Sequence, residues 1–151
     1  MKKVVILALV ALLSLASCSF MCLKKPKLKN TRWVCEYKEF VADVGNETVT
    51  VTLHFVSAKE FELEFASVMP PYPAMHMNAD GTVDTMPGYT RQYSIKGTYK
   101  ASRELVTLTE ENGETKTLQY VADKLVSNDL SYQTLVFEKA TNEYFHVLPR
   151  A

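Results

Sequence analysis

The stretch TVTVTLHF, residues 48–55, alternates polar and apolar side chains at every position. Successive side chains of a β-strand point to opposite faces, so this alternation predicts a strand with one buried face and one wet face. The apolar face carries Val49, Val51, Leu53 and Phe55. Such a strand is typical of an antiparallel sheet that covers a core on one side.

The same two-residue period continues along most of the chain. It predicts further strands at residues 32–41, 61–65, 91–100, 104–109, 115–121, 124–128 and 132–138. Short polar turns separate them, and Asn112-Gly113 is the strongest hairpin signal among these turns. No segment between residues 31 and 139 is typical of an amphipathic helix. We therefore expect an all-β fold, a single up-and-down antiparallel barrel of about eight strands, because closure removes exposed sheet edges.

An eight-stranded barrel has an interior that side chains fill or that holds one small ligand. Aromatic residues are numerous on the predicted inward faces: Trp33, Tyr37, Phe55, Phe61, Phe65, Tyr93, Tyr99, Tyr120 and Phe137. These rings favour a mostly filled interior, although they also offer a surface for a small apolar or amphipathic ligand. We predict that the site for such a ligand includes Trp33, Tyr37, Phe55, Phe65, Met69, Tyr72, Met75, Tyr93 and Tyr99.

The first residues carry the features of a bacterial lipoprotein signal. Two lysines precede an apolar run at residues 4–13, which is too short to span a bilayer. Leu15-Ala16-Ser17-Cys18 then resembles the lipobox, in which the cysteine becomes the first mature residue. That resemblance implies that residues 1–17 are a signal peptide. It also implies that Cys18 carries a diacylglycerol and an acyl chain such as palmitate, which together anchor the protein to a membrane.

A basic tether at residues 18–29 is expected to follow the signal. It contains KKPKLK, residues 24–29, an extended segment that anionic headgroups attract. By analogy with other lipoproteins of this kind, Ser19 at the second mature position implies the outer membrane, and the absence of an acidic cluster after Cys18 implies its periplasmic face. All seventeen Asp and Glu residues lie after residue 29 with only eleven of the Lys and Arg, so the remaining chain carries about −6 charges. That negative charge excludes nucleic-acid binding. We expect the protein to be a monomer.

Two cysteines, Cys22 and Cys35, remain once Cys18 is lipidated. The periplasm is oxidising, and a bridge between them would close a loop of about fourteen residues and contribute about 3 kcal/mol. In the alternative, Cys35 is a buried core thiol and Cys22 is free in the tether. Neither cysteine has CxxC spacing, so a zinc or redox role has little support.

Three short motifs resemble those of small Bacteroidetes-type lipoproteins with a lipocalin-like barrel. LKNTRW, residues 28–33, resembles the opening motif of that group, with Asn30 where the group prefers glycine. Asn tolerates this position because it also adopts positive φ. IKGTY, residues 95–99, resembles the Gly-x-Tyr strand, and FEK, residues 137–139, resembles the close of the last strand. The resemblance implies a lipocalin-like barrel at residues 30–139, a C-terminal tail at residues 140–151 and no shared catalytic residues.

The segment 69–88 interrupts the alternation with four prolines and four methionines. We expect an irregular loop there, either a plain connection or a gate that lies across the barrel opening above a ligand. The side chains of Met75, His76 and Met77 are of the kinds that Cu(I) prefers, so copper binding is a minor alternative. No cofactor is otherwise expected.

No catalytic motif is present, and we do not expect an enzyme. His54, Glu60, Glu62 and Glu64 are predicted to lie on wet strand faces. The sequence therefore indicates a membrane-anchored periplasmic lipoprotein that acts as a non-catalytic binding module for a small apolar or amphipathic ligand, gated by residues 69–88. The alternative is an envelope interaction protein with a solid barrel, whose partner is another envelope protein or a hydrolase that it inhibits.

Overall fold

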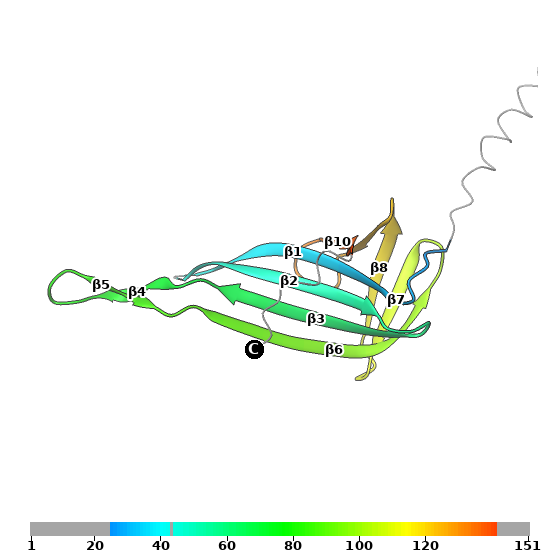
Figure 1. The fold of residues 1–151 in the computed structure, drawn as a ribbon, viewed down its shortest axis with the longest axis horizontal. Helices are drawn as coiled ribbons and strands as arrows, with labels where there is room; N and C mark the ends of the chain where they lie inside the picture. Colours follow the sequence, from blue (N-terminus) through cyan, green and yellow to red (C-terminus); the bar gives the residue numbers. More distant parts are fainter. Residues whose placement is uncertain (1–24, 43, 142–151) are drawn as a thin grey trace, which may run out of the picture.

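The computed structural model describes residues 25–42 and 44–141, which form an all-β fold (Figure 1). Eight strands close into an antiparallel barrel in the order β1-β10-β9-β8-β7-β6-β3-β2. Their bounds are β1 (Thr31–Val41), β2 (Gly45–Phe55), β3 (Glu60–Met69), β6 (Tyr89–Ala101), β7 (Leu105–Glu110), β8 (Thr115–Val121), β9 (Lys124–Ser127) and β10 (Leu135–Lys139). The prediction of an up-and-down barrel is confirmed, and the strand order is consistent with a lipocalin-like fold.

A short seam between β1 and β10 closes the barrel. Trp33 lies opposite Lys139 and Val34 lies opposite Glu138 in this antiparallel pair. One further bond extends the seam, because the backbone N–H of Ala140 donates to the carbonyl of Arg32 at 2.9 Å. At the closed end, neither β1 nor β10 is therefore left as an open sheet edge.

The barrel has a long half and a short half. Strands β1, β2, β3 and β6 have 10 to 13 residues, whereas β7 to β10 have 4 to 7. The short strands pair with the long half only near one end, since β7 opposes residues 97–101 of β6. We call that end the closed end. The long strands continue past the short half to the opposite end, which we call the mouth.

Apolar side chains fill the closed end. The buried residues of β1, β2 and β3 follow the predicted alternation, and Tyr99 is the buried residue of β6. Leu28, which precedes β1, belongs to the same cluster. The chain turns at Asn30, whose φ of 58° is in the left-handed region, as the sequence predicted. The core comprises Leu28, Trp33, Cys35, Val49, Val51, Leu53, Phe55, Phe61, Leu63, Phe65, Tyr99, Val106, Leu108, Leu118, Leu125, Leu135 and Phe137.

Gly97 lies where β6 changes from pairing with one neighbour to pairing with two. A Cβ atom at this position would lie 2.1 Å from the carbonyl oxygen of Thr109 and 2.9 Å from the ring of Phe61. Only glycine therefore allows β6, β7 and the Phe61 ring to approach this closely.

The segment 69–88 is not the irregular loop that the sequence predicted. It forms a hairpin of β4 (Tyr72–Met77) and β5 (Val83–Met86), closed by a bond from Asn78 N–H to the carbonyl of Thr82 at 2.7 Å. The prolines made the sequence look unsuited to strand pairing. However, proline is tolerated on edge strands, and both strands of a two-stranded sheet are edge strands. Figure 1 shows the hairpin continuing the direction of β3 and β6 away from the barrel, not folding across its end.

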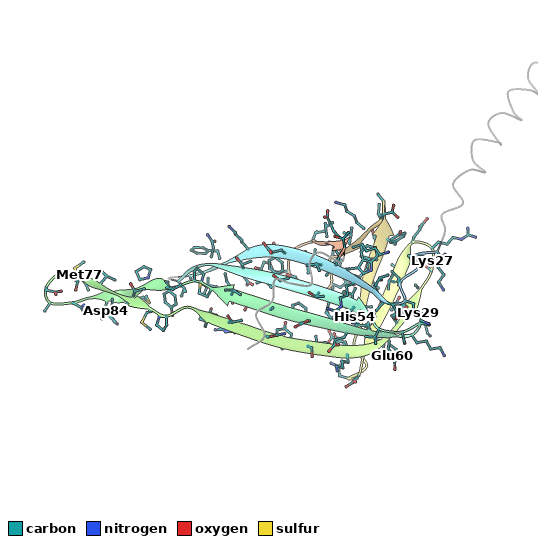
Figure 2. The ribbon with its side chains drawn as sticks, viewed as in Figure 1. Lys27, Lys29, His54, Glu60, Met77 and Asp84 are labelled. Carbon is teal, nitrogen blue, oxygen red and sulfur yellow. The ribbon has the colours of Figure 1, made fainter. Side chains whose placement is uncertain are left out.

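Residues 25–29, the described part of the tether, and the hairpin tip lie at opposite ends of the molecule. Figure 2 places Lys27 and Lys29 beside the closed end, and Met77 and Asp84 at the far end of the hairpin. An anchor attached through the N-terminal segment would therefore lie on the side of the closed end. The mouth and the hairpin point away from that side.

Replacing residues 72–86 with Asn-Gly tests whether the hairpin supports the barrel. Strand β4 pairs with β5 in a sheet of their own, so we expect the free energy of unfolding to change by less than about 1 kcal/mol. Urea denaturation followed by tryptophan fluorescence measures this, because Trp33 is buried in the core. A loss of several kcal/mol would show that the hairpin is part of the folding unit.

Candidate functional site

A pocket of 360 Å³ opens at the mouth. Its walls come from all four long strands and from the connection between β9 and β10, residues 128–134, which we call the mouth loop. The lining residues are Tyr37, Glu39, Glu47, Val49, Phe65, Ser67, Arg91, Tyr93, Leu130, Ser131 and Tyr132.

Strand register arranges these side chains in rows above the core. Glu39 opposes Glu47 on β1 and β2, and Tyr37 opposes Val49 one row further in. On the other side, Ser67 opposes Arg91, and Phe65 opposes Tyr93. Residues two apart on one strand share a face, so the face that fills the core at the closed end lines the pocket at the mouth.

Aromatic rings form one wall of the pocket. The rings of Phe65 and Tyr93 stack with centroids 4.8 Å apart and planes 10° apart. Tyr93 is 58% exposed although it lies on the inward face, because no strand of the short half covers it at this height. Burial raises the pKa of Tyr93, and burial raises the pKa of Tyr37 against a hydrogen bond with Ser131. Both phenols therefore stay neutral at physiological pH.

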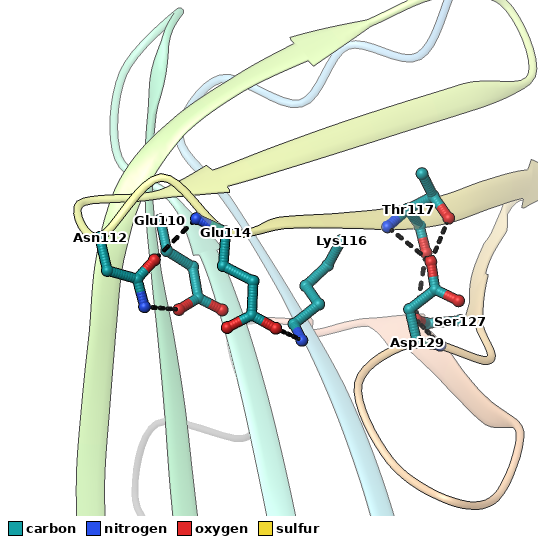
Figure 3. A network of polar contacts seen from close by, with 7 residues as sticks. All are labelled: Glu110, Asn112, Glu114, Lys116, Thr117, Ser127 and Asp129. Carbon is teal, nitrogen blue, oxygen red and sulfur yellow. Dashed lines mark hydrogen bonds and ion pairs between the residues drawn. The ribbon is translucent and has the colours of Figure 1, made fainter.

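A polar network fixes the base of the mouth loop (Figure 3). The carboxylate of Asp129 accepts hydrogen bonds from the backbone N–H of Thr117, at 3.1 Å, and from the Thr117 hydroxyl. The buried hydroxyl of Ser127 donates to the Thr117 carbonyl at 3.1 Å and accepts from the backbone N–H of Asp129 at 3.2 Å. The hydrogen bonds to Thr117 hold the pKa of Asp129 below its usual value. These bonds tie the loop to β8 and so hold the pocket wall that it carries.

The charged groups of the pocket differ in their contacts. The guanidinium of Arg91 lies over the Tyr89 ring, 4.4 Å from its centroid. Glu39 is half-buried, and burial together with this nearby carboxylate raises the pKa of Tyr132 in the mouth loop. Glu47 is buried. The pocket is thus apolar and aromatic at its base and carries two carboxylates and one guanidinium nearer its rim.

The structure brings together only part of the predicted ligand site. Tyr37, Phe65 and Tyr93 line the mouth pocket. Trp33 and Phe55 belong to the filled core, where Trp33 meets Tyr120 edge-on and Phe55 meets Tyr99 in the same way. These core residues were misplaced because alternation predicts which face a side chain is on, and not how far along the barrel it lies.

The remaining predicted residues lie elsewhere. Met69 is buried at the end of β3, whereas Tyr72 and Met75 lie on the hairpin and do not line the mouth pocket. Tyr99 lines a different pocket of 370 Å³ at the closed end, together with Lys25, Pro26 and Leu28 of the tether. A third pocket, of 570 Å³, lies beside the seam of β1 and β10 and is lined largely by outward-facing residues such as Val34, Glu36 and Glu138.

Sequence reasoning missed most of the polar residues in the mouth pocket. Glu47 precedes TVTVTLHF in the same register as the buried residues, so a charged side chain at a predicted core position was a readable signal. Arg91 offers the same signal on β6, two positions before Tyr93. The mouth-loop residues had no such signal, because only folding brings residues 130–132 to β1. The missed residues are Glu39, Glu47, Val49, Ser67, Arg91, Leu130, Ser131 and Tyr132.

The predicted metal-binding residues remain at the surface. Met75 and Met77 are 73% and 71% exposed, and His76 is also exposed. Residues 25–42 and 44–141 contain no group of three or more His, Cys, Asp or Glu side chains that could hold a metal ion. Copper binding through the two methionines and His76 stays a prediction that no contact in the described hairpin supports.

Of the two cysteines in the predicted disulfide, the structure describes only Cys35. Cys35 is a free thiol in the core, and burial raises its pKa while a backbone hydrogen bond from Val136 lowers it. A buried thiol with a raised pKa is a poor nucleophile. Cys22 and the predicted lipidation site, Cys18, lie outside the described residues.

The polar residues on the outer strand faces contact their cross-strand neighbours. Glu62 forms an ion pair with Lys96 at 3.4 Å, and Glu64 accepts a hydrogen bond from Gln92. His54 is half-buried, and burial together with the nearby charge of Arg32 lowers its pKa. These contacts are those of a solvated barrel surface.

No protein-family model matches the chain, and no curated protein or solved structure is significantly similar to it. Among residues 25–42 and 44–141 there is no helix long and apolar enough to cross a membrane. The candidate site therefore has to be interpreted from its own geometry and chemistry.

The acid dependence of the mouth loop can be predicted from Asp129. Because the folded pKa of this carboxyl is lowered, its stabilising effect is complete above the ordinary Asp pKa and is lost as pH falls through the folded pKa. We expect Asp129→Ala to lower stability and to speed amide exchange at Thr117 near neutral pH, with both differences vanishing in acid. Exchange and urea denaturation over a pH series measure this. The exposed Glu104→Gln should show neither difference, and a pH-independent effect of Asp129→Ala would contradict the assignment.

Proposed function

We propose that this chain is a non-catalytic binding protein of the bacterial envelope that takes a small amphipathic molecule into the mouth of its barrel. One observation carries the proposal: an aromatic pocket of 360 Å³ lies above an interior that is otherwise filled. Ligand sites of proteins are concave, mostly apolar, about 300–1,000 Å³ in volume, and contain a few polar groups that orient the ligand. The mouth pocket agrees with that description in size and in lining.

The shape of the pocket suits a ligand with an apolar part and a polar part. Phe65, Val49 and Leu130 offer apolar surface, whereas Glu39, Glu47 and Arg91 offer charge. A ligand that enters with its apolar part toward the core would leave its polar part at the level of these charged groups. A wholly apolar ligand would leave the buried charge of Glu47 without compensation.

The proposed location is the periplasmic face of the outer membrane, through lipid on Cys18. The resemblance of residues 15–18 to a lipobox supports this location, and the basic tether agrees with it. The hairpin is then not a gate, since it extends away from the opening. In this proposal the mouth faces away from the anchoring membrane and receives its ligand from the periplasm.

A second candidate function is protein binding through the hairpin. Its exposed apolar residues are Met75, Met77, Val83 and Met86. Exposed edge strands can pair with a strand of another protein, and methionine-rich surfaces adapt to several partners. This observation favours the interaction class, whose partner would be another envelope protein or an inhibited hydrolase, and it is compatible with a ligand in the mouth.

Blocking the pocket tests the binding proposal. In Ser67→Trp the indole would occupy the pocket, whereas in Ser94→Trp the same ring would lie on the outer face of β6. We expect calorimetry with the neutral amphipathic ligand hexanol to show binding by the unmodified chain and by Ser94→Trp. Affinity should fall at least about tenfold in Ser67→Trp, a loss of about 1.4 kcal/mol. Equal affinity in all three proteins, or no binding at all, would contradict the proposal.

The anchor is tested separately. Cys18→Ala removes the only thiol in the lipobox-like sequence, so we expect the protein to move from the membrane fraction to the soluble fraction. Immunoblots of fractionated cells measure this shift, with Cys22→Ala as the matched control that should remain in membranes. Retention of the Cys18→Ala protein in membranes would refute lipidation at this residue.

A further inference from the structure

Glu47 carries a buried carboxylate oxygen that lacks a partner. Glu47 is 6% exposed, and its side chain lines the mouth pocket from the inward face of β2. Oε1 is buried and has no hydrogen-bond partner among the described residues. A buried charged acceptor without a donor is unfavourable, and the large majority of such groups in native proteins have partners.

The neighbouring cations do not satisfy this oxygen. The ion pairs within the described residues join Lys96 to Glu62, Lys116 to Glu114 and Lys124 to Glu138, and none of them includes Glu47. Arg91 lines the same pocket, but its guanidinium lies over the ring of Tyr89. The other buried atom without a partner in the described chain, Nε2 of Gln133, belongs to the mouth loop, and Gln133 does not line the pocket.

A second carboxylate increases the local negative charge. Glu39 lies directly opposite Glu47 in the β1–β2 ladder, and both side chains line the pocket. Like charges at directly opposed positions of a ladder repel each other. Tyr132 lies near Glu39 but brings no positive charge. A cation placed between the two carboxylates would remove this repulsion and supply the donor that Glu47 lacks.

The aromatic wall is suited to the same kind of ligand. A cation within about 6 Å of the face of a tyrosine or phenylalanine ring is attracted by the ring quadrupole. Tyr37, Tyr93 and Tyr132 line the same pocket as the carboxylate pair, and the stacked rings of Phe65 and Tyr93 continue toward the core. The pocket therefore combines negative charge, aromatic faces and an apolar base.

We propose that the mouth pocket selects ligands in which a protonated amine is joined to an apolar body, with the ammonium N–H donating to Oε1 of Glu47. This inference rests on the proposed ligand-binding function and specifies its chemical class. The apolar body lies against Phe65 and Leu130, and Glu39 provides the second negative charge. A primary or secondary amine fits better than a quaternary ammonium, because the unpartnered oxygen requires a hydrogen-bond donor. A metal ion fits less well, because the pocket is mostly aromatic and offers only two carboxylates.

A matched set of four probes tests this selectivity on the full lipid-anchored chain in nanodiscs, with empty nanodiscs subtracted. The probes are hexylamine, hexanol, hexanoate and hexyltrimethylammonium, which share one apolar body. We expect calorimetry near neutral pH to show that hexylamine binds at least about tenfold more tightly than each of the others, because only its ammonium group can donate a hydrogen bond between two charged groups to Glu47.

Glu47→Gln keeps the size of the side chain and removes its charge. We expect this variant to lose at least about tenfold in hexylamine affinity, so that the preference for hexylamine over hexanol disappears. Glu36→Gln, on the outer face of β1, is the matched control and should change neither affinity. The probe series on the unmodified chain gives a result even if the Glu47→Gln variant does not fold.

Three results would overturn the inference while leaving the binding function intact. They are equal affinity for hexylamine and hexanol, equal affinity for the primary and quaternary amines, and tighter binding of hexanoate, which would make Arg91 the recognising group. Failure of all four probes to bind would instead contradict the proposed binding function itself.

Discussion

Closure of the barrel depends on the pairing of β1 with β10. Two register pairs and the additional bond from Ala140 to Arg32 join these strands. Trp33 belongs to this seam and also to the core, where its ring meets Tyr120 edge-on at 6.3 Å. The pairing of the first strand with the last therefore also covers the interior of the barrel. Without the seam, two sheet edges and the apolar rows behind them would be exposed to water.

The mouth pocket is a consequence of unequal strand length. The four long strands continue their inward-facing rows beyond the point where the short strands end. Within the closed end these rows are covered and apolar, whereas beyond it they are partly open and become aromatic and charged. The mouth loop closes part of the gap, and its position depends on the bonds between Asp129, Ser127 and Thr117. A filled core and an open pocket thus coexist in one barrel.

The two ends of the molecule differ in chemistry. Lysines and Leu28 gather at the closed end, next to the N-terminal segment. The mouth carries carboxylates and tyrosines, and the hairpin beyond it exposes methionines. This polarity agrees with a protein that is held at one end and interacts at the other. The proposed ligand site in the mouth and the proposed partner site on the hairpin are separate surfaces, so one does not exclude the other.

The sequence by itself determined the strands, their faces and the barrel class, because side-chain alternation is a local property that each strand displays independently. It also placed Tyr37, Phe65 and Tyr93 on the interior face. Tertiary structure alone decided which interior residues are packed and which line a pocket, because that depends on the relative lengths of strands far apart in sequence. Only folding brings Tyr132 to Glu39 and leaves Oε1 of Glu47 without a donor. The hairpin was likewise decided by cross-strand pairing, a non-local interaction that its prolines concealed.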